Sequence, residues 1–240
     1  MKKGKLILFP VAIGGELLDA VLPTENKRWL ETCHTFIVEE IRTARRFLKR
    51  AGYPIPIDDV AFFELNEHNT STNDIGSYLD PIADGNNVGL LSEAGLPCIA
   101  DPGAAIVAIA QQRAIEVLPL VGPSSLLLAL MASGLNGQSF AFNGYLPVDR
   151  SRRYAALRHL EDRVWREHQT QLFIEAPYRN NQMLEALCAT LRSDTLICVA
   201  CDITLPSQII RTLPCSQWKT ERLALNLHKH NTVFLIGSPQ

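Results

Sequence analysis

Short apolar runs typical of strands alternate with longer amphipathic segments along the whole chain. This alternation constrains the fold more than any other feature, because it is typical of α/β proteins. In the first half, the predicted strands are 6–9, 35–39, 60–65, 87–92 and 116–120, and the predicted helices are 73–83 and 103–112. Asp101 and Pro102 stand where an N-cap and a first turn belong. The helix 103–112 is apolar almost all round, so we expect it to be buried.

The second half repeats the alternation with one difference. Its predicted helices are 126–132 and 180–192, and its predicted strands are 139–144, 171–175, 196–203, 207–212 and 232–236. Only Pro206 and a short turn separate two of these strands, which predicts an antiparallel hairpin and hence a mixed sheet. We therefore expect an α/β fold of two lobes, 1–118 and 119–240, with a mainly parallel N-terminal sheet and a mixed C-terminal sheet. The cleft between the lobes is the expected ligand site.

Composition narrows the class of protein. The chain has 240 residues, of which 47% are hydrophobic and 20% are charged, and its net charge is −2. These values are ordinary for a soluble globular protein and argue against a disordered chain, a coiled coil or a collagen-like fibre. The near-neutral charge also argues against general coating of DNA or RNA, although a local basic patch is compatible with it.

The N-terminal segment shows no membrane signal. Its apolar run, 6–13, is interrupted by Pro10, is too short for a membrane span and lacks a small-residue cleavage site. We expect a cytoplasmic protein with no membrane partner.

The cysteines and histidines do not form a metal motif. Cys198 and Cys201 spell C-x-x-C, but no second pair and no histidine cluster stands near them in sequence. They fall in a predicted strand, where positions three apart face opposite sides, so a redox pair is also disfavoured. We expect buried thiols and no metal site. The remaining histidines without ligand spacing are expected on the surface: His34, His159, His168, His228 and His230.

Four loops that follow predicted strands are rich in Gly, Pro or Ser. The first, 10–15, lacks the G-x-G-x-x-G fingerprint of nicotinamide cofactors. The second, 92–103, contains glycines that let a ligand approach the backbone and leads into a helix N-terminus. The third, 120–125, is not a Walker loop, because no Gly-Lys-Ser/Thr follows it. The fourth is 174–179.

Together these segments resemble the tetrapyrrole methylase superfamily. The motifs that carry the resemblance are, in order, P-x-x-I-G, E-E-x-R, N-E-H-N, S-E-A-G-x-P-x-I-x-D-P-G, G-P-S-S, A-S-G-L, F-x-G-Y-L-P and E-A-P-Y-R. The chain is most similar to the branch that 2′-O-methylates a cytidine ribose in small-subunit ribosomal RNA. The resemblance covers residues 6 to 212. Because the chain ends at Gln240, it resembles a short form of that branch.

The resemblance implies a class III methyltransferase that is a homodimer and binds S-adenosylmethionine in the cleft between two α/β lobes. It implies cofactor contacts from all four loops. These contacts are Ile13, Gly14, Glu93, Gly95, Leu96, Ser124, Ser125 and Ile174. Such a cofactor needs apolar walls and backbone amides, which these loops offer.

The substrate-side motifs depart further from the branch than the cofactor loops do. Residues 66–69 read N-E-H-N instead of the usual H-E-H-N, and residues 202–205 read D-I-T-L instead of E-L-T-K, which loses a lysine. Methyl transfer is therefore better supported than any one acceptor. Two alternatives stay open: a tetrapyrrole (corrin or porphyrin) C-methyltransferase, and a non-catalytic scaffold that binds S-adenosylmethionine.

Acid–base and substrate residues follow from side-chain chemistry. A hydroxyl acceptor benefits from a general base, and Glu40 and His68 are the candidates. Basic residues at helical spacing after residue 40 form one stripe, which either contacts ribosomal RNA or is a solvated helix face. The candidate substrate residues are Arg42, Arg45, Arg46, Lys49 and, from the fourth loop, Arg179; Arg50 continues the stripe.

Overall fold

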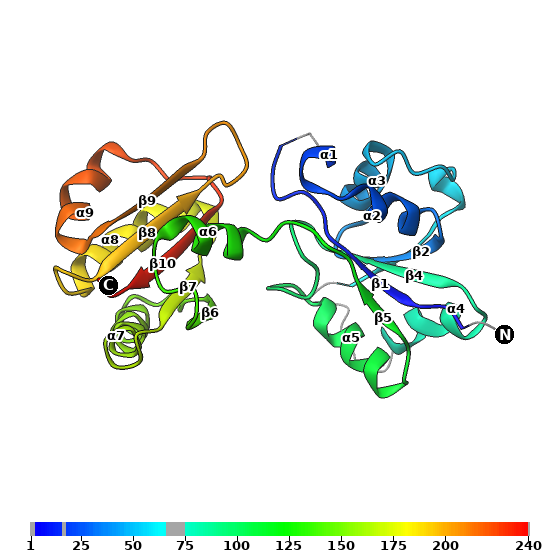
Figure 1. The fold of residues 1–240 in the computed structure, drawn as a ribbon, viewed down its shortest axis with the longest axis horizontal. Coiled ribbons are helices and arrows are strands. Elements are labelled where there is room, and N and C mark those ends of the chain that lie inside the picture. The colour runs from blue at the N-terminus through cyan, green and yellow to red at the C-terminus, as the bar shows by residue number, and fades with distance from the viewer. Residues whose placement is uncertain (1–2, 16–17, 66–74, 240) are drawn as a thin grey trace. The chain divides into compact units, whose positions relative to one another are not determined.

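The computed structural model describes residues 3–15, 18–65 and 75–239 (Figure 1). The chain divides into two compact units, Met1–Ser124 and Ser125–Gln240. The domain boundary after residue 118 stays a prediction of the sequence. Each unit contains one five-stranded sheet, so the expectation of two α/β units is confirmed.

The first unit is built on a parallel sheet. Its strands are β1 (Leu6–Phe9), β2 (Cys33–Val38), β3 (Ala61–Glu64), β4 (Asn87–Leu91) and β5 (Val117–Pro119), in the order β3-β2-β4-β1-β5. All four pairings among its described strands are parallel, in agreement with the mainly parallel sheet expected from the sequence. The strands therefore end at one common edge, and the loops that follow them meet there.

Apolar layers cover both faces of this sheet, because alternate residues of a strand point to opposite sides. Ile7 of β1 packs with α2 (Thr24–Leu30) and α3 (Ile41–Arg50). Leu6 packs on the other face with the 3₁₀ helix η2 (Ile75–Leu79), α4 (Asp80–Ala83) and α5 (Gly103–Gln112). The unit's remaining elements are α1 (Leu18–Val21) and the 3₁₀ helix η1 (Ile57–Asp59).

Two helix predictions need correction. The predicted helix 73–83 is a 3₁₀ turn followed by one α-helical turn over residues 75–83, and residues 73 and 74 lie outside the described part. The expectation that 103–112 is buried all round is wrong. Only one face of α5 packs on the sheet, and most of the outward positions are exposed alanines, whose small apolar surface costs little in water. These alanines are Ala104, Ala105 and Ala108.

The second unit is built on a mixed sheet. Its strands are β6 (Phe140–Tyr145), β7 (Thr170–Ile174), β8 (Leu196–Cys201), β9 (Ile209–Pro214) and β10 (Thr232–Gly237), in the order β6-β7-β10-β8-β9. Among the described strands of this sheet, only β6 and β7 pair in parallel. β8 and β9 form the predicted antiparallel hairpin, although β9 begins later than expected.

Helices cover both faces of the second sheet as well. On one face lie α7 (Arg150–Glu167), α8 (Asn180–Thr190) and α9 (Cys215–Glu221), packed on residues that include Cys201. On the other lies α6 (Ser125–Ser133), packed on residues that include Cys198. The C-x-x-C cysteines thus belong to opposite faces, as predicted, and both are buried free thiols. Two 3₁₀ turns complete the unit, η3 (Pro177–Arg179) and η4 (Arg222–Ala224).

Membrane-spanning character is not found in the described residues: none of their helices combines the length and the apolarity that crossing a bilayer requires.

Candidate functional site

The first three glycine-rich loops converge on Gly95. The backbone N–H of Val11 donates to the carbonyl of Gly95 at 2.9 Å, which joins the first loop to the second. Gly95 has a φ of +75°, and a Cβ placed on it would lie 3.2 Å from the carbonyl oxygen of Pro123 and 3.8 Å from Cγ1 of Ile13. A side chain at this position would therefore be strained and would enter the space shared by the three loops.

Further contacts hold these loops together. A Cβ on Gly122 would lie 2.2 Å from Cβ of Pro10, so glycine is required where the third loop crosses the first. Ser92 donates its hydroxyl to the Gly95 carbonyl at 3.0 Å within the second loop. The structure therefore brings Ile13, Gly95 and the segment before Ser124 together.

Asp101 closes the second loop on its helix. Its carboxylate accepts hydrogen bonds from the backbone N–H of Cys98 at 2.8 Å and of Gly103 at 2.7 Å. Burial raises the pKa of Asp101, while these backbone donors act in the opposite direction. The predicted N-cap is wrong by one residue, because Pro102 is the N-cap of α5, but Asp101 still accepts a hydrogen bond from the first residue of the helix.

The remaining predicted cofactor residues have different surroundings. Gly14 and Leu96 are half-buried, and Glu93 is exposed. In the second unit, Ser125 begins α6 and Ile174 ends β7. Ile174 packs beside the apolar cluster that α6 covers, so the structure places these two residues on elements that share one core.

A pocket of about 530 Å³ lies at the same sheet edge of the first unit. Its walls come from the first loop, from α3 and from the segment that follows β4. The charged side chains that line it are Arg46, Lys49, Arg50 and Glu93. The pocket is therefore mainly basic on the α3 side.

The basic stripe on α3 is exposed along its length, whereas Ala44 and Leu48 on the opposite face are buried. Its members are nevertheless engaged differently. The Arg45 guanidinium lies over the Phe62 ring at 5.6 Å from its centroid, and Arg50 donates to the carbonyl of Gly15 at 3.3 Å. Arg42 and Arg45 do not line the described pocket. The structure thus separates the stripe into pocket residues and outer residues.

Glu40, one predicted base, is the N-cap of α3. Its carboxylate accepts from the backbone N–H of Arg42 at 2.8 Å and of Thr43 at 2.9 Å, and from the Thr43 hydroxyl at 2.7 Å. These donors lower the pKa of Glu40, the Thr43 hydroxyl most of all. A carboxylate with a lowered pKa is a weak proton acceptor. The other predicted base, His68, lies outside the described residues.

The adjacent Glu39 was not considered from the sequence. Burial raises its pKa, and the neighbouring charges of Asp101 and Glu93 raise it further, against a hydrogen bond from the Glu93 backbone. Its position directly after a buried strand of a parallel sheet was the available signal. Proximity to Asp101 and Glu93, which come from another loop, was not readable from the sequence.

Arg179 of the fourth loop is held by a buried carboxylate. Its Nε donates to Oε1 of Glu175 at 3.0 Å, and its guanidinium lies over the Tyr178 ring at 5.0 Å from the centroid. The Glu175 side chain is fully buried. Arg179 therefore neutralises a buried charge, which sequence inspection did not anticipate for this predicted substrate residue.

Comparison with known proteins gives consistent matches. The family model described as Tetrapyrrole (Corrin/Porphyrin) Methylases matches residues 22–217. The protein named Ribosomal RNA small subunit methyltransferase I from Pseudomonas aeruginosa is 30% identical over 217 residues, which cover 90% of this chain and 72% of that protein. Its namesake from Escherichia coli O157:H7 is 28% identical over 215 residues, with 90% and 71% covered.

Solved structures agree in fold. The methyltransferase CobJ matches with a TM-score of 0.64 and 18% identity, covering 98% of this chain and 94% of its own. The cobalt precorrin-4 methyltransferase CbiF matches with a TM-score of 0.58 and 13% identity, covering 97% and 94%. At such identities these two likenesses concern the fold alone.

Proposed function

Because the chain belongs to the tetrapyrrole methylase family, we propose that it methylates the 2′-hydroxyl of a ribose in small-subunit ribosomal RNA. The chain is an S-adenosylmethionine-dependent methyltransferase. The observation that carries the proposal is the convergence of three loops on Gly95, at the residues where the family resemblance implies the cofactor. The choice of ribosomal RNA rests on the names of the relatives and on the basic pocket beside that convergence.

The residues present fit S-adenosylmethionine. Gly95 holds its backbone at a positive φ where a Cβ would crowd the Pro123 carbonyl, so the three loops meet through bare main chain, which offers backbone groups to a ligand. Ile13 supplies a half-buried apolar wall. We assign cofactor contacts in the first unit to Ile13, Gly14, Glu93, Gly95, Leu96 and Ser124, and in the second to Ser125 and Ile174.

The bound cofactor supplies an electrophilic methyl group on a sulfonium. The protein's part is to orient the acceptor hydroxyl for in-line attack and to take its proton. Glu40 and His68 remain the bases proposed from sequence. The capping hydrogen bonds of Glu40, which lower its pKa, argue against Glu40 as the base. Glu39 is the better carboxylate candidate, because its raised pKa makes it a stronger proton acceptor.

The RNA backbone would meet the basic wall of the pocket. Arg46, Lys49 and Arg50 lie on one side of it, and guanidinium and ammonium groups bind phosphate oxygens. We retain Arg42 and Arg45 as outer contacts of the same surface. Arg179 is the weakest substrate candidate, because Glu175 already engages it.

We further propose that the enzyme is a cytoplasmic homodimer. The support in the structure is an apolar strip on α6, where Leu127 and Met131 lie one turn apart and Met131 is 79% exposed. Large exposed apolar side chains at helical spacing are typical of an interface. A second copy of the chain would cover this strip.

The test is a map of ribose methylation in ribosomal RNA from cells with and without the protein, followed by methylation of purified small subunits in vitro. Loss of one 2′-O-methyl group and its restoration by the pure protein would support the proposal. Turnover on a tetrapyrrole instead would favour C-methyl transfer. Cofactor binding without turnover on either substrate would favour the scaffold alternative.

A further inference from the structure

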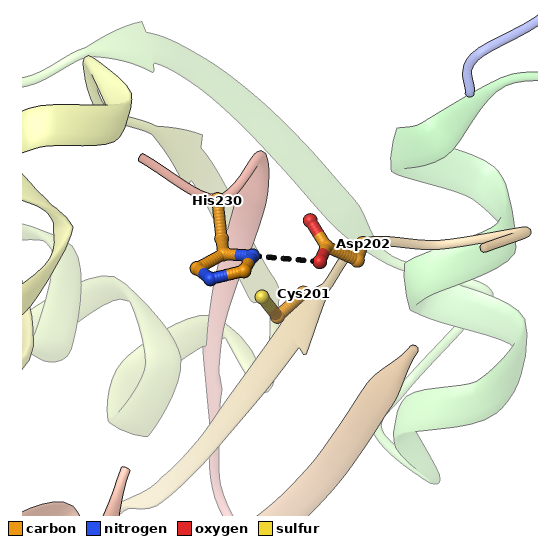
Figure 2. A group of neighbouring side chains, drawn as sticks. All are labelled: Cys201, Asp202 and His230. Carbon is orange, nitrogen blue, oxygen red and sulfur yellow. Dashed lines mark hydrogen bonds and ion pairs between the residues drawn. The ribbon is translucent and has the colours of Figure 1, made fainter. Parts of the chain in front are cut away.

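Three side chains of different donor chemistry meet at one edge of the second unit (Figure 2). Cys201 and Asp202 stand at the end of β8, and His230 stands two residues before β10. One ligand atom from each lies within 4.8 Å of the others, and Nδ1 of His230 is 2.7 Å from Oδ2 of Asp202. From the sequence alone, Cys201 is expected to be a core thiol and His230 a surface residue.

The backbone explains how two consecutive residues reach the same spot. Neighbours in a strand face opposite sides, but Asp202 has a φ of +49°, so the strand ends there and the carboxylate turns away from the pleat. The backbone N–H of Asp202 donates to the carbonyl of Asn231 at 2.8 Å. This bond ties the end of β8 to the segment that carries His230.

Surrounding hydrogen bonds hold the donor groups in place. Ser207 donates its hydroxyl to Oδ2 of Asp202 at 2.8 Å. Asn180 donates its side-chain amide to the carbonyl of His230 at 2.6 Å. Such outer bonds fix the orientation of metal ligands in known sites, and their presence means that little ordering is left for a metal to impose.

We propose that Cys201, Asp202 and His230 form a zinc-binding site. Thiolate, carboxylate and imidazole are the donors that Zn²⁺ takes in tetrahedral coordination. A thiolate and a carboxylate together carry two negative charges, which match the charge of the dication at a spot where Cys201 and Asp202 are both buried. The His230 side chain is 43% exposed, so solvent reaches the cluster and a water molecule can supply the fourth ligand, as in zinc sites with three protein ligands.

Binding replaces protons with the metal. The thiol of Cys201 gives up its proton to solvent. The proton of the neutral His230 ring stands on Nε2 in the bound state, so that Nδ1 is free to bind the metal and Asp202 binds as a carboxylate. Two ligands about 2.0 Å from one zinc lie about 3.3 Å apart in a tetrahedron, so the His230 ring moves outward by roughly 0.6 Å. Its partial exposure permits this movement.

The experiment uses the metal alone, without S-adenosylmethionine or RNA, so its result does not depend on the proposed function. The full-length chain is stripped with a chelator and titrated with Zn²⁺ and Co²⁺. We expect one equivalent per chain and, with Co²⁺, a thiolate charge-transfer absorption. Cys201→Ser should remove that absorption, and His230→Gln and Asp202→Asn should weaken Zn²⁺ binding at least about tenfold.

The chain offers matched controls. Cys198→Ser removes a buried thiol from the opposite face of the same sheet, and His228→Gln removes an exposed imidazole from the same segment as His230. Both should bind metal as the parent does. If Cys201→Ser does not fold, His230→Gln decides, because its ring is partly exposed. If the chelator-treated parent takes up no metal, or if His230→Gln binds Zn²⁺ with unchanged affinity, the proposal is wrong. His230 and Asp202 would then be a hydrogen-bonded pair without a metal.

Discussion

Glu39 and Glu40 are consecutive residues at the end of β2, yet their surroundings shift the pKa values of their carboxyl groups in opposite directions. Glu40 caps α3 through hydrogen bonds that lower its pKa. Burial, together with the nearby Asp101 and Glu93, raises the pKa of Glu39. The ionised carboxylate of Glu40 therefore stabilises the fold, whereas the ionised carboxylate of the adjacent Glu39 destabilises it.

This contrast predicts opposite effects of two isosteric changes on stability. The folded pKa of Glu39 is raised, so the native state holds its proton more tightly than the unfolded chain does, and stability falls as pH rises from the ordinary carboxyl value through the folded one. Glu39→Gln should therefore raise the melting temperature at neutral pH and lose this advantage near pH 4. Thermal unfolding across this pH range measures the effect.

Glu40→Gln is the matched control and should show the reverse. Its lowered pKa means that its stabilisation is present above the ordinary carboxyl value and is lost as pH falls through the folded value. The variant should melt lower than the parent at neutral pH and approach it in acid. Equal shifts of the same sign in both variants would show that the two environments do not differ as described.

The cofactor assignment predicts the effect of Gly95→Val. The new side chain would enter the space shared by the three loops, and the affinity for S-adenosylmethionine should fall at least about tenfold, or roughly 1.4 kcal/mol, in a calorimetric titration. Gly52→Val is the control, because Gly52 also has a positive φ, of +73°, but has no neighbouring atoms within 4 Å of a built Cβ. Full affinity in a folded Gly95→Val protein would remove the second loop from the cofactor site.

The division of the basic stripe predicts unequal effects on RNA binding. Arg46→Gln combined with Lys49→Gln removes two charges from the pocket wall, and the slope of log affinity against log salt should shrink by about one unit for each lost phosphate contact. Arg42→Gln combined with Arg45→Gln removes the same charge outside the pocket and should change the slope less. Filter binding of small-subunit RNA over a salt series gives the slope for each double variant. If the two double variants have the same slope, the effect comes from overall charge and not from the pocket.

The proposed dimer predicts that Met131→Lys yields a monomer. Burying a lysine in an apolar interface without a partner is costly, so association should weaken by at least about tenfold. Light scattering during size-exclusion chromatography measures the mass. Leu223→Lys, at a similarly exposed apolar position of the same unit, should leave the mass of the parent unchanged. A monomeric parent would refute the homodimer directly.

The local pattern of the sequence was sufficient for the class of fold. Alternation of apolar runs with amphipathic segments predicted the strands, the parallel first sheet and the β8–β9 hairpin, because strand and helix periodicities are properties of neighbouring residues. The same periodicity placed Cys198 and Cys201 on opposite faces. It failed for α5, because an apolar composition does not show which side of a helix a sheet will cover.

The tertiary structure alone decided which distant groups meet. Asp202 and His230 are 28 residues apart, and the pairing of β10 with β8 brings them into contact. Burial and the nearby charge of Asp101, which lies in the loop after β4, raise the pKa of Glu39. The pocket is lined by Arg46, Lys49 and Arg50 but not by Arg42 and Arg45. Sequence periodicity reports the face on which a side chain lies. The electrostatic surroundings and the ligand geometry of that side chain depend on segments brought beside it by folding.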